Sequence, residues 1–209
     1  MLAVVLGGIA LGGLAGGLWL RRDPEAFRFA AIVSLAAGLC CALGYAGFPL
    51  VVAPFGNREI TGFIGVLRVS VPLILPVALL SGISFTLVGA ALRREYPSAA
   101  VTAGSLTFAN TTGAGLGAFA GGFLLLPSLG MEASFFLIAV LYAGIALLLL
   151  GRARAPKGAV YATGGALALT LALFPWGAMR ERHLMATAGR WAGSRDWKVV
   201  GLREALDET

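Results

Sequence analysis

Long apolar segments alternate with short polar ones along the chain. Each of these segments approaches the roughly 20 residues that a helix needs to cross a bilayer. We therefore predict an all-α integral membrane protein with about six transmembrane helices and a short polar C-terminal tail. The predicted spans are Leu2–Leu20, Phe29–Val52, Val71–Leu92, Ser105–Gly130, Ala133–Leu150 and Ala159–Phe174.

Prolines interrupt the second and third segments. We predict that the second helix bends or frays at Pro49, because proline lacks the amide that continues the helical hydrogen-bond ladder. An interfacial turn over residues 62–70 is expected before the third helix. Arg68 in that turn either reaches the lipid headgroups or lines a cavity as an anion-binding residue.

Two segments carry glycine at every fourth position, which places the glycines on one face of a helix. Such a face lets another backbone approach closely, and close approach favours association of helices in lipid. The two helices either contact each other or pack on different, bulkier neighbours. The predicted packing residues are Gly8, Gly12, Gly16, Gly113, Gly117 and Gly121.

A polar cluster lies within the fourth apolar segment. Asn110, Thr111 and Thr112 precede the glycines of that segment. Polar groups inside a bilayer need partners within protein or line a cavity. These three residues therefore either find partners within the protein or line a cavity, and Arg68 is a further candidate for lining that cavity.

Composition agrees with a membrane location. Hydrophobic residues make up 58% of the chain and charged residues only 12%, against roughly 25% charged in soluble domains. The net charge is +6, but the basic residues lie mainly in the loops, which indicates contact with lipid headgroups rather than nucleic acid. We expect a multi-pass protein of the cell inner membrane whose first partner is the lipid bilayer.

Orientation is not decided by the loop charges. Eight basic residues follow the first, third and fifth spans, and two follow the second. The tail carries six more basic residues and lies on the same side of the membrane as the loop after the second span. Each side therefore carries eight basic residues. The positive-inside rule therefore gives no preference.

No sequence motif for catalysis, cofactor binding or metal binding is evident. The chain lacks a phosphate-binding loop and the paired histidines of zinc proteases. Cys40 and Cys41 are adjacent and have no metal-ligand spacing, and the single histidine, His183, lies in the tail. We predict no catalytic, cofactor-binding or metal-binding residue. Glu132 is placed at a helix start, where it suits the positive end of the helix dipole.

The fourth segment resembles the membrane domain of bacterial spermidine-synthase-like proteins. The resemblance rests on Asn110-Thr111-Thr112-Gly113-Ala114, on Gly117, and on the run Gly121–Gly130, with weaker agreement at 6–17, 67–68 and 198–204. In that family a helical domain of major-facilitator type precedes a domain like polyamine aminopropyltransferases. The family usually has one more helix in front of the part that this chain matches.

The chain changes from apolar to polar after residue 177, so we predict a transmembrane domain over residues 1–177 and a polar tail over 178–209. The resemblance implies that this tail is the start of a truncated synthase-like domain. The motifs that bind the aminopropyl donor would follow this tail, so the chain alone is expected not to be an enzyme. We expect a membrane anchor or accessory subunit, packed against partner membrane proteins or a soluble synthase-like partner.

The alternative is a half-size transporter for a small solute such as a polyamine, working as a dimer. Interrupted helices often mark transport sites, which favours this alternative. The lack of a carboxylate inside a predicted span counts against a proton-coupled form of it.

Overall fold

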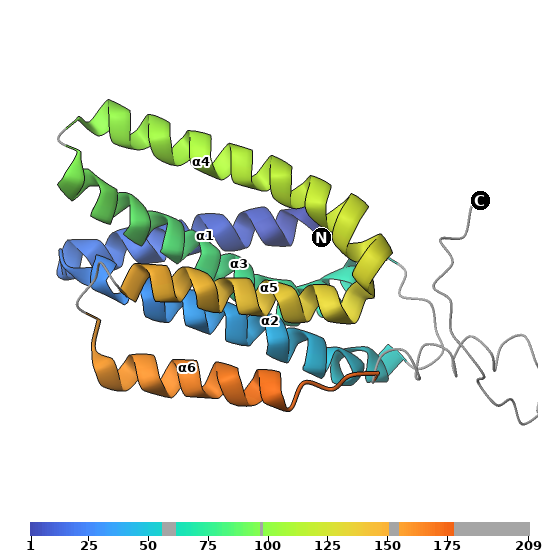
Figure 1. Ribbon diagram of the computed structural model, residues 1–209. Helices are drawn as coiled ribbons and strands as arrows, with labels where there is room; N and C mark the ends of the chain where they lie inside the picture. Colours follow the sequence, from blue (N-terminus) through green and yellow to red (C-terminus); the bar gives the residue numbers. More distant parts are fainter. Residues whose placement is uncertain (56–61, 97, 151–154, 178–209) are drawn as a thin grey trace, which may run out of the picture.

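The computed structural model describes residues 1–55, 62–96, 98–150 and 155–177, and every regular element in them is helical. The all-α prediction is confirmed for this part of the chain. A 3-10 helix, Ala26–Phe29, precedes α2 and another, Ala53–Phe55, follows it, while a π-helix, Ala120–Leu125, joins α4 to α5. The α-helices are α1 Leu2–Arg22, α2 Ala30–Val52, α3 Gly62–Glu95, α4 Ala99–Phe119, α5 Leu126–Leu150 and α6 Lys157–Ala172 (Figure 1).

Within the described residues, four helices are long and apolar enough to cross a membrane: Leu2–Arg22, Ala26–Phe55, Gly62–Glu95 and Ala99–Leu150. The last of these contains α4, the π-helix and α5, and it folds back on itself near Gly130, where φ is 74° (Figure 1). The 16 residues of α6 extend about 24 Å, less than the roughly 30 Å of a hydrocarbon core. The membrane character is thus supported, whereas six separate spans are not confirmed.

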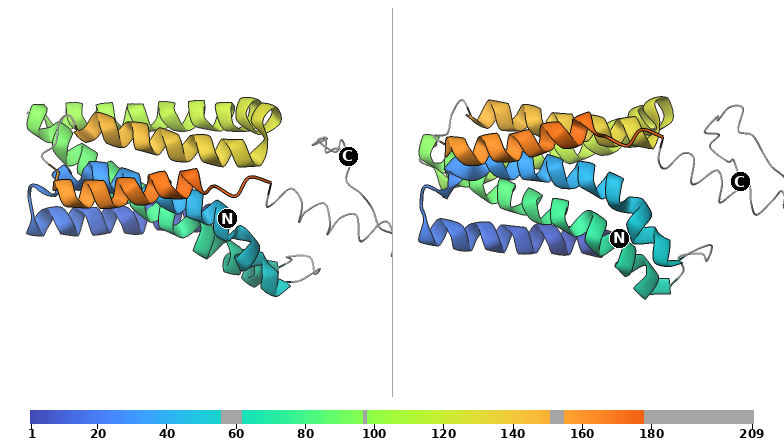
Figure 2. Two further views of the ribbon diagram at one scale, coloured as in Figure 1. Left: turned by 60° about the horizontal axis from the view of Figure 1, so that its bottom comes forward. Right: turned by 90° about the horizontal axis from the view of Figure 1, so that it is seen from below.

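The predicted interfacial turn over residues 62–70 is wrong, because α3 is helical from Gly62. Pro72 and Pro76 lie inside α3, and Pro49 lies inside α2. Each proline removes one backbone hydrogen bond, but a helix still satisfies more backbone groups than any other conformation available in lipid. The last part of α2 and the first part of α3 bend together away from the other helices (Figure 2).

The predicted fourth helix, 105–130, begins earlier and divides. α4 starts at Ala99, after Ser98, whose hydroxyl accepts a hydrogen bond from the Val101 amide at 3.4 Å. The α-helical pattern ends at Phe119 and continues as a π-helix. Gly130 then supplies the positive φ at which the chain reverses.

The core lies around α2, which contacts α3, α5 and α6. Successive helices run in opposite directions, so the start of α1 and the end of α6 lie at the same end of the bundle (Figure 1). Small side chains dominate the buried positions, which lets the helices approach closely. One cluster consists of Ala31, Leu35, Ala42, Ala139, Ala146 and Leu167, and the other of Ala26, Ala30, Val33 and Leu87.

Candidate functional site

The glycines of α1 lie against α3. Gly8, Gly12 and Gly16 are buried. A Cβ on Gly8 would lie 2.6 Å from the Cβ of Ala78, and a Cβ on Gly12 would overlap the carbonyl oxygen of Leu79. These positions therefore have no room for a side chain.

α3 contributes a matching glycine to this contact. A Cβ on Gly82 would overlap the carbonyl oxygen of Ile9. The Thr86 hydroxyl lies 3.1 Å from the Gly82 carbonyl oxygen and 3.4 Å from that of Gly13, so it also links the two helices. Of the two arrangements that the sequence leaves open, the glycines of α1 pack on α3 and not on α4.

The glycines of α4 have a different environment. No atom of another helix lies within 4 Å of the Cβ positions of Gly113, Gly117 or Gly121. α4 touches α3 near its start, where the buried Thr102 donates a hydrogen bond to the Tyr96 carbonyl oxygen and Leu106 lies against Gly89. Every residue from 107 to 119 is exposed.

The stripe of Gly113 and Gly117 lies on the side of α4 that contacts α3. Gly113 follows Leu106 by seven residues and Gly117 follows it by eleven, which are about two and three turns of a helix. Asn110, four residues after Leu106, lies on the same side. α4 therefore separates from α3 after Leu106, and the face that would continue the contact is open. We call Asn110, Gly113 and Gly117 the inner face of α4.

The predicted cavity-lining residues are not brought together by described contacts. Asn110, Thr111 and Thr112 are exposed on α4, and their side chains form no hydrogen bond with any described residue. Arg68 is exposed, in the second turn of α3. No described ion pair joins it to another residue.

The structure also shows a polar site that the sequence did not predict. The half-buried Glu132 accepts a hydrogen bond at 2.5 Å from the hydroxyl of Tyr45 on α2. Its two carboxylate oxygens also lie 3.2 and 3.1 Å from the amide nitrogen of Gly177, which donates to them. Among the described residues, no basic side chain pairs with Glu132.

Aromatic rings pack against Tyr45 and against one another next to this carboxylate's partners. Tyr45 is 2% exposed and stacks on Phe174 with ring centroids 4.8 Å apart. Phe136 contacts both Phe174 and Trp176, at 5.4 and 5.1 Å. The segment after α6 is thus fixed to α2 and α5 up to Gly177. The sequence signal was a lone carboxylate between apolar runs, but its partners are 87 and 45 residues away and only the fold identifies them.

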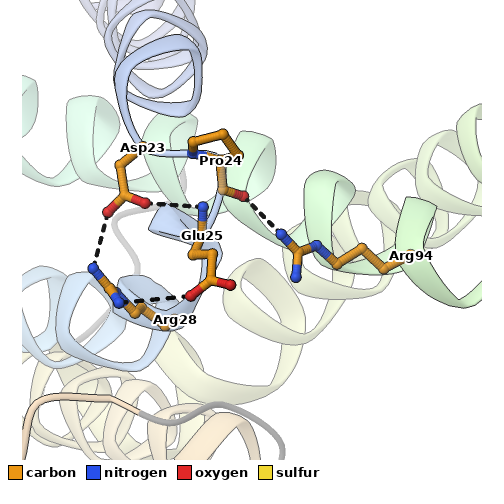
Figure 3. A network of polar contacts seen from close by, with 5 residues as sticks. All are labelled: Asp23, Pro24, Glu25, Arg28 and Arg94. Carbon is orange, nitrogen blue, oxygen red and sulfur yellow. Dashed lines mark hydrogen bonds and ion pairs between the residues drawn. The ribbon is translucent and has the colours of Figure 1, made fainter.

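A network of charged residues lies at the end of the bundle opposite to Glu132 (Figure 3). Arg28 pairs with Asp23 at 3.1 Å and with Glu25 at 3.7 Å, and the Glu25 amide donates to Asp23 at 3.0 Å. Arg94, at the end of α3, donates to the Pro24 carbonyl oxygen at 3.1 Å. The network therefore joins the turn between α1 and α2 to the end of α3.

This network has a structural explanation. The guanidinium of Arg94 also lies 4.3 Å from the ring centroid of Phe27, in cation–π geometry. The side chains of Arg28 and Asp23 are 38% and 33% exposed, and such exposed pairs contribute about 0–1 kcal/mol. Its contacts fix the turn rather than form a catalytic constellation.

Comparison with known proteins found no matching family model, curated protein or solved structure. In the described part of the chain, no group of three or more histidine, cysteine or acidic residues is placed to hold a metal ion.

Proposed function

We propose that this chain is a non-catalytic membrane anchor and accessory subunit, located in the inner membrane and packed against a partner membrane protein through the inner face of α4. The open inner face carries this proposal. Asn110 lies near the middle of α4, where lipid offers no hydrogen-bond partner. A helix from another polypeptide would supply both the missing packing and the missing polar partner.

The sequence resemblance extends the proposal to the spermidine-synthase-like family, as its membrane part. The tail after Gly177 would then dock a synthase-like protein. The contacts of Glu132 with Tyr45 and Gly177 support this role, because they fix the point at which the tail leaves the bundle. The tail itself lies outside the described residues.

The test is purification of the tagged protein from its native membrane in a gentle detergent, with mass spectrometry of the co-purifying proteins. We expect a membrane partner with the natural chain and its loss with Gly113→Leu. Gly144→Leu is the matched control, because Gly144 is also an exposed helical glycine with no atom within 4 Å of its Cβ position.

The outcomes separate the possible partners. A co-purifying synthase-like protein would indicate a split enzyme with this chain as its membrane half. A large membrane assembly would indicate an accessory subunit without a link to polyamine chemistry. Purification of the natural chain without any other protein would contradict the proposal.

A half-size transporter remains the second candidate, and Glu132 is the observation that favours it. The sequence placed no carboxylate inside a span, but Glu132 is half-buried and bound to a buried tyrosine. Uptake of a small organic cation into proteoliposomes, abolished by Glu132→Gln, would support this candidate. Absence of uptake by the natural chain would exclude it for the cations used.

A further inference from the structure

We infer that α2 and α3 share a hinge, and that the thickness of the bilayer sets its angle. The hinge lies where both helices contain a proline, Pro49 in α2 and Pro72 in α3. The end of α2 and the start of α3 bend away from the other helices (Figure 2), and we call residues 46–55 and 62–68 the bent arm. The inference does not depend on the proposed function, which concerns the inner face of α4.

A close contact aligns α2 with α3. A Cβ on Gly44 would lie 3.5 Å from the carbonyl oxygen of Leu73, so these two residues are level with each other. The two helices run in opposite directions (Figure 1). One residue forward along α2 is therefore level with one residue back along α3. Pro49, five residues after Gly44, is thus level with Arg68, five residues before Leu73.

The missing helical hydrogen bonds consequently lie side by side. Proline has no amide hydrogen, so α2 lacks the helical bond between residues 49 and 45, and α3 lacks the one between 72 and 68. Both gaps cover the same turn of the two neighbouring helices. An intact neighbour would support a helix with a single break, whereas two breaks at one level allow both helices to bend together.

Burial changes at the same level. Tyr45 is the last buried residue of α2, and Val69 is the first buried residue of α3. No residue of the bent arm is buried. Tyr45 is also tied to α5, through its hydrogen bond to Glu132. The other helices therefore hold α2 and α3 up to the hinge and leave the bent arm partly exposed beyond it.

A buried hydroxyl lies inside the break of α3. Ser70 is only 1% exposed, and its hydroxyl has no hydrogen-bond partner among the described residues. A buried polar group without a partner destabilises the conformation that contains it. The side chain of Ser70 therefore does not stabilise the bent form over a straighter one.

The lengths of the two helical segments make bilayer thickness the factor that acts on the hinge. The 34 residues of α3 extend about 51 Å, and the 30 residues of Ala26–Phe55 about 45 Å. A hydrocarbon core is roughly 30 Å thick, and helices longer than the core tilt or kink to fit. We expect a thin bilayer to increase the bend and a thick bilayer to straighten the arm.

The experiment measures the distance between two spin labels by double electron–electron resonance, on a background in which Cys40 and Cys41 are replaced by alanine. One label is attached at Phe63→Cys in the bent arm and the other at Leu169→Cys on α6, and both positions are exposed. The protein is reconstituted in thin bilayers of dimyristoleoylphosphatidylcholine and in thick bilayers of dierucoylphosphatidylcholine.

The natural hinge should give a distance that depends on the lipid. Phe63 is nine residues from Pro72, so a change of about 20° in the bend moves it by about 5 Å. We expect the mean distance to be about 3 Å shorter in the thick bilayer, because a straighter arm lies closer to the other helices. The control pair, Leu147→Cys with Leu169→Cys, lies outside the bent arm and should show no change.

A double variant tests the two breaks. Pro49→Ala with Pro72→Ala restores both amides, and alanine favours helix, so the shift between the two lipids should fall about threefold. Pro76→Ala is the matched control. Pro76 also lies inside α3, but its missing bond is level with residues 41–45, where α2 has no proline. This control should leave the shift unchanged.

Two results would overturn the inference: equal distances in the two lipids for the natural hinge, or an equal shift with and without the two prolines. The proposed function is tested separately, by loss of a partner with Gly113→Leu. A lipid-dependent distance without a partner, or a partner without a lipid-dependent distance, would show which of the two fails.

Discussion

At the scale of single residues, the contact between α1 and α3 depends on the absence of side chains. Gly12 and Gly82 each lie against a backbone carbonyl of the other helix, and a backbone cannot move as a flexible side chain can. The spacing of glycines in the sequence indicated that α1 had a packing face. It did not indicate the partner, because complementarity to Ala78 and Gly82 depends on how the helices are arranged.

Gly12→Leu should therefore destabilise the protein. Overpacking typically costs about 1–3 kcal/mol, and the upper part of this range applies because the obstructing atoms belong to the backbone. Gly17→Leu in the same helix is the control, since no atom lies within 4 Å of its Cβ position. Thermal unfolding in detergent, followed by circular dichroism, should show a lower Tm for Gly12→Leu alone. Equal Tm values would contradict the packing described here.

Glu132 is the second residue whose substitution should lower the stability of the protein. Glu132→Ala removes an acceptor from Tyr45 and from Gly177, and hydrogen bonds to charged groups contribute about 1.5–3 kcal/mol. We expect the free energy of unfolding to fall by about 2 kcal/mol. Glu95→Gln, at the exposed end of α3, should have little effect.

A double-mutant cycle isolates the contact between Glu132 and Tyr45. The losses from Glu132→Ala and Tyr45→Phe should not add, and the coupling energy should be about 1 kcal/mol. Additive losses would show that the hydrogen bond contributes nothing to stability.

At the scale of helices, the apolar segments predicted most of the helices. They predicted few of the points at which a helix begins, ends or changes to another helical type. The first, second and sixth helices lie close to the predicted ranges. α3 begins at Gly62 rather than at the predicted Val71. A charged residue such as Arg68 beside an apolar run indicates an interfacial turn, whereas lipid favours a continuous helix. The division of the fourth segment into α4 and a π-helix has no signal in the apolar pattern.

The candidate sites, like the helices, were predictable from the sequence only in part. The inner face of α4 was predicted as a glycine stripe with a polar cluster, but the absence of a neighbour there is a property of the whole bundle. The partners of Glu132 were not predictable, because Tyr45 and Gly177 become its neighbours only when α2, α5 and the end of α6 pack together.

At the scale of the whole molecule, the arrangement of the helices determines which segments share a side of the membrane. The turns after α1 and α3 lie at one end of the bundle, joined by Arg94 and Pro24, and the start of α3 lies at the other (Figures 1 and 3). The relation holds for either orientation of the protein.

Cysteine labelling with a membrane-impermeant maleimide tests this arrangement, again with Cys40 and Cys41 replaced by alanine. Arg22→Cys and Arg94→Cys should be labelled from one side, and Phe63→Cys, at the exposed start of α3, from the other. Labelling of Arg22→Cys and Arg94→Cys from opposite sides would contradict the fold. The same experiment shows which side faces the cytoplasm.

Because α4 has few contacts with the rest of the bundle, its local opening should differ from that of the core. Described contacts hold this helix near its start, at Tyr96 and Gly89, and through the π-helix at its end. Segments with few buried contacts open at a lower free energy than the core around them. Backbone amides of α4 should therefore exchange hydrogen earlier than those of α2, and the core can be complete while α4 still changes its position.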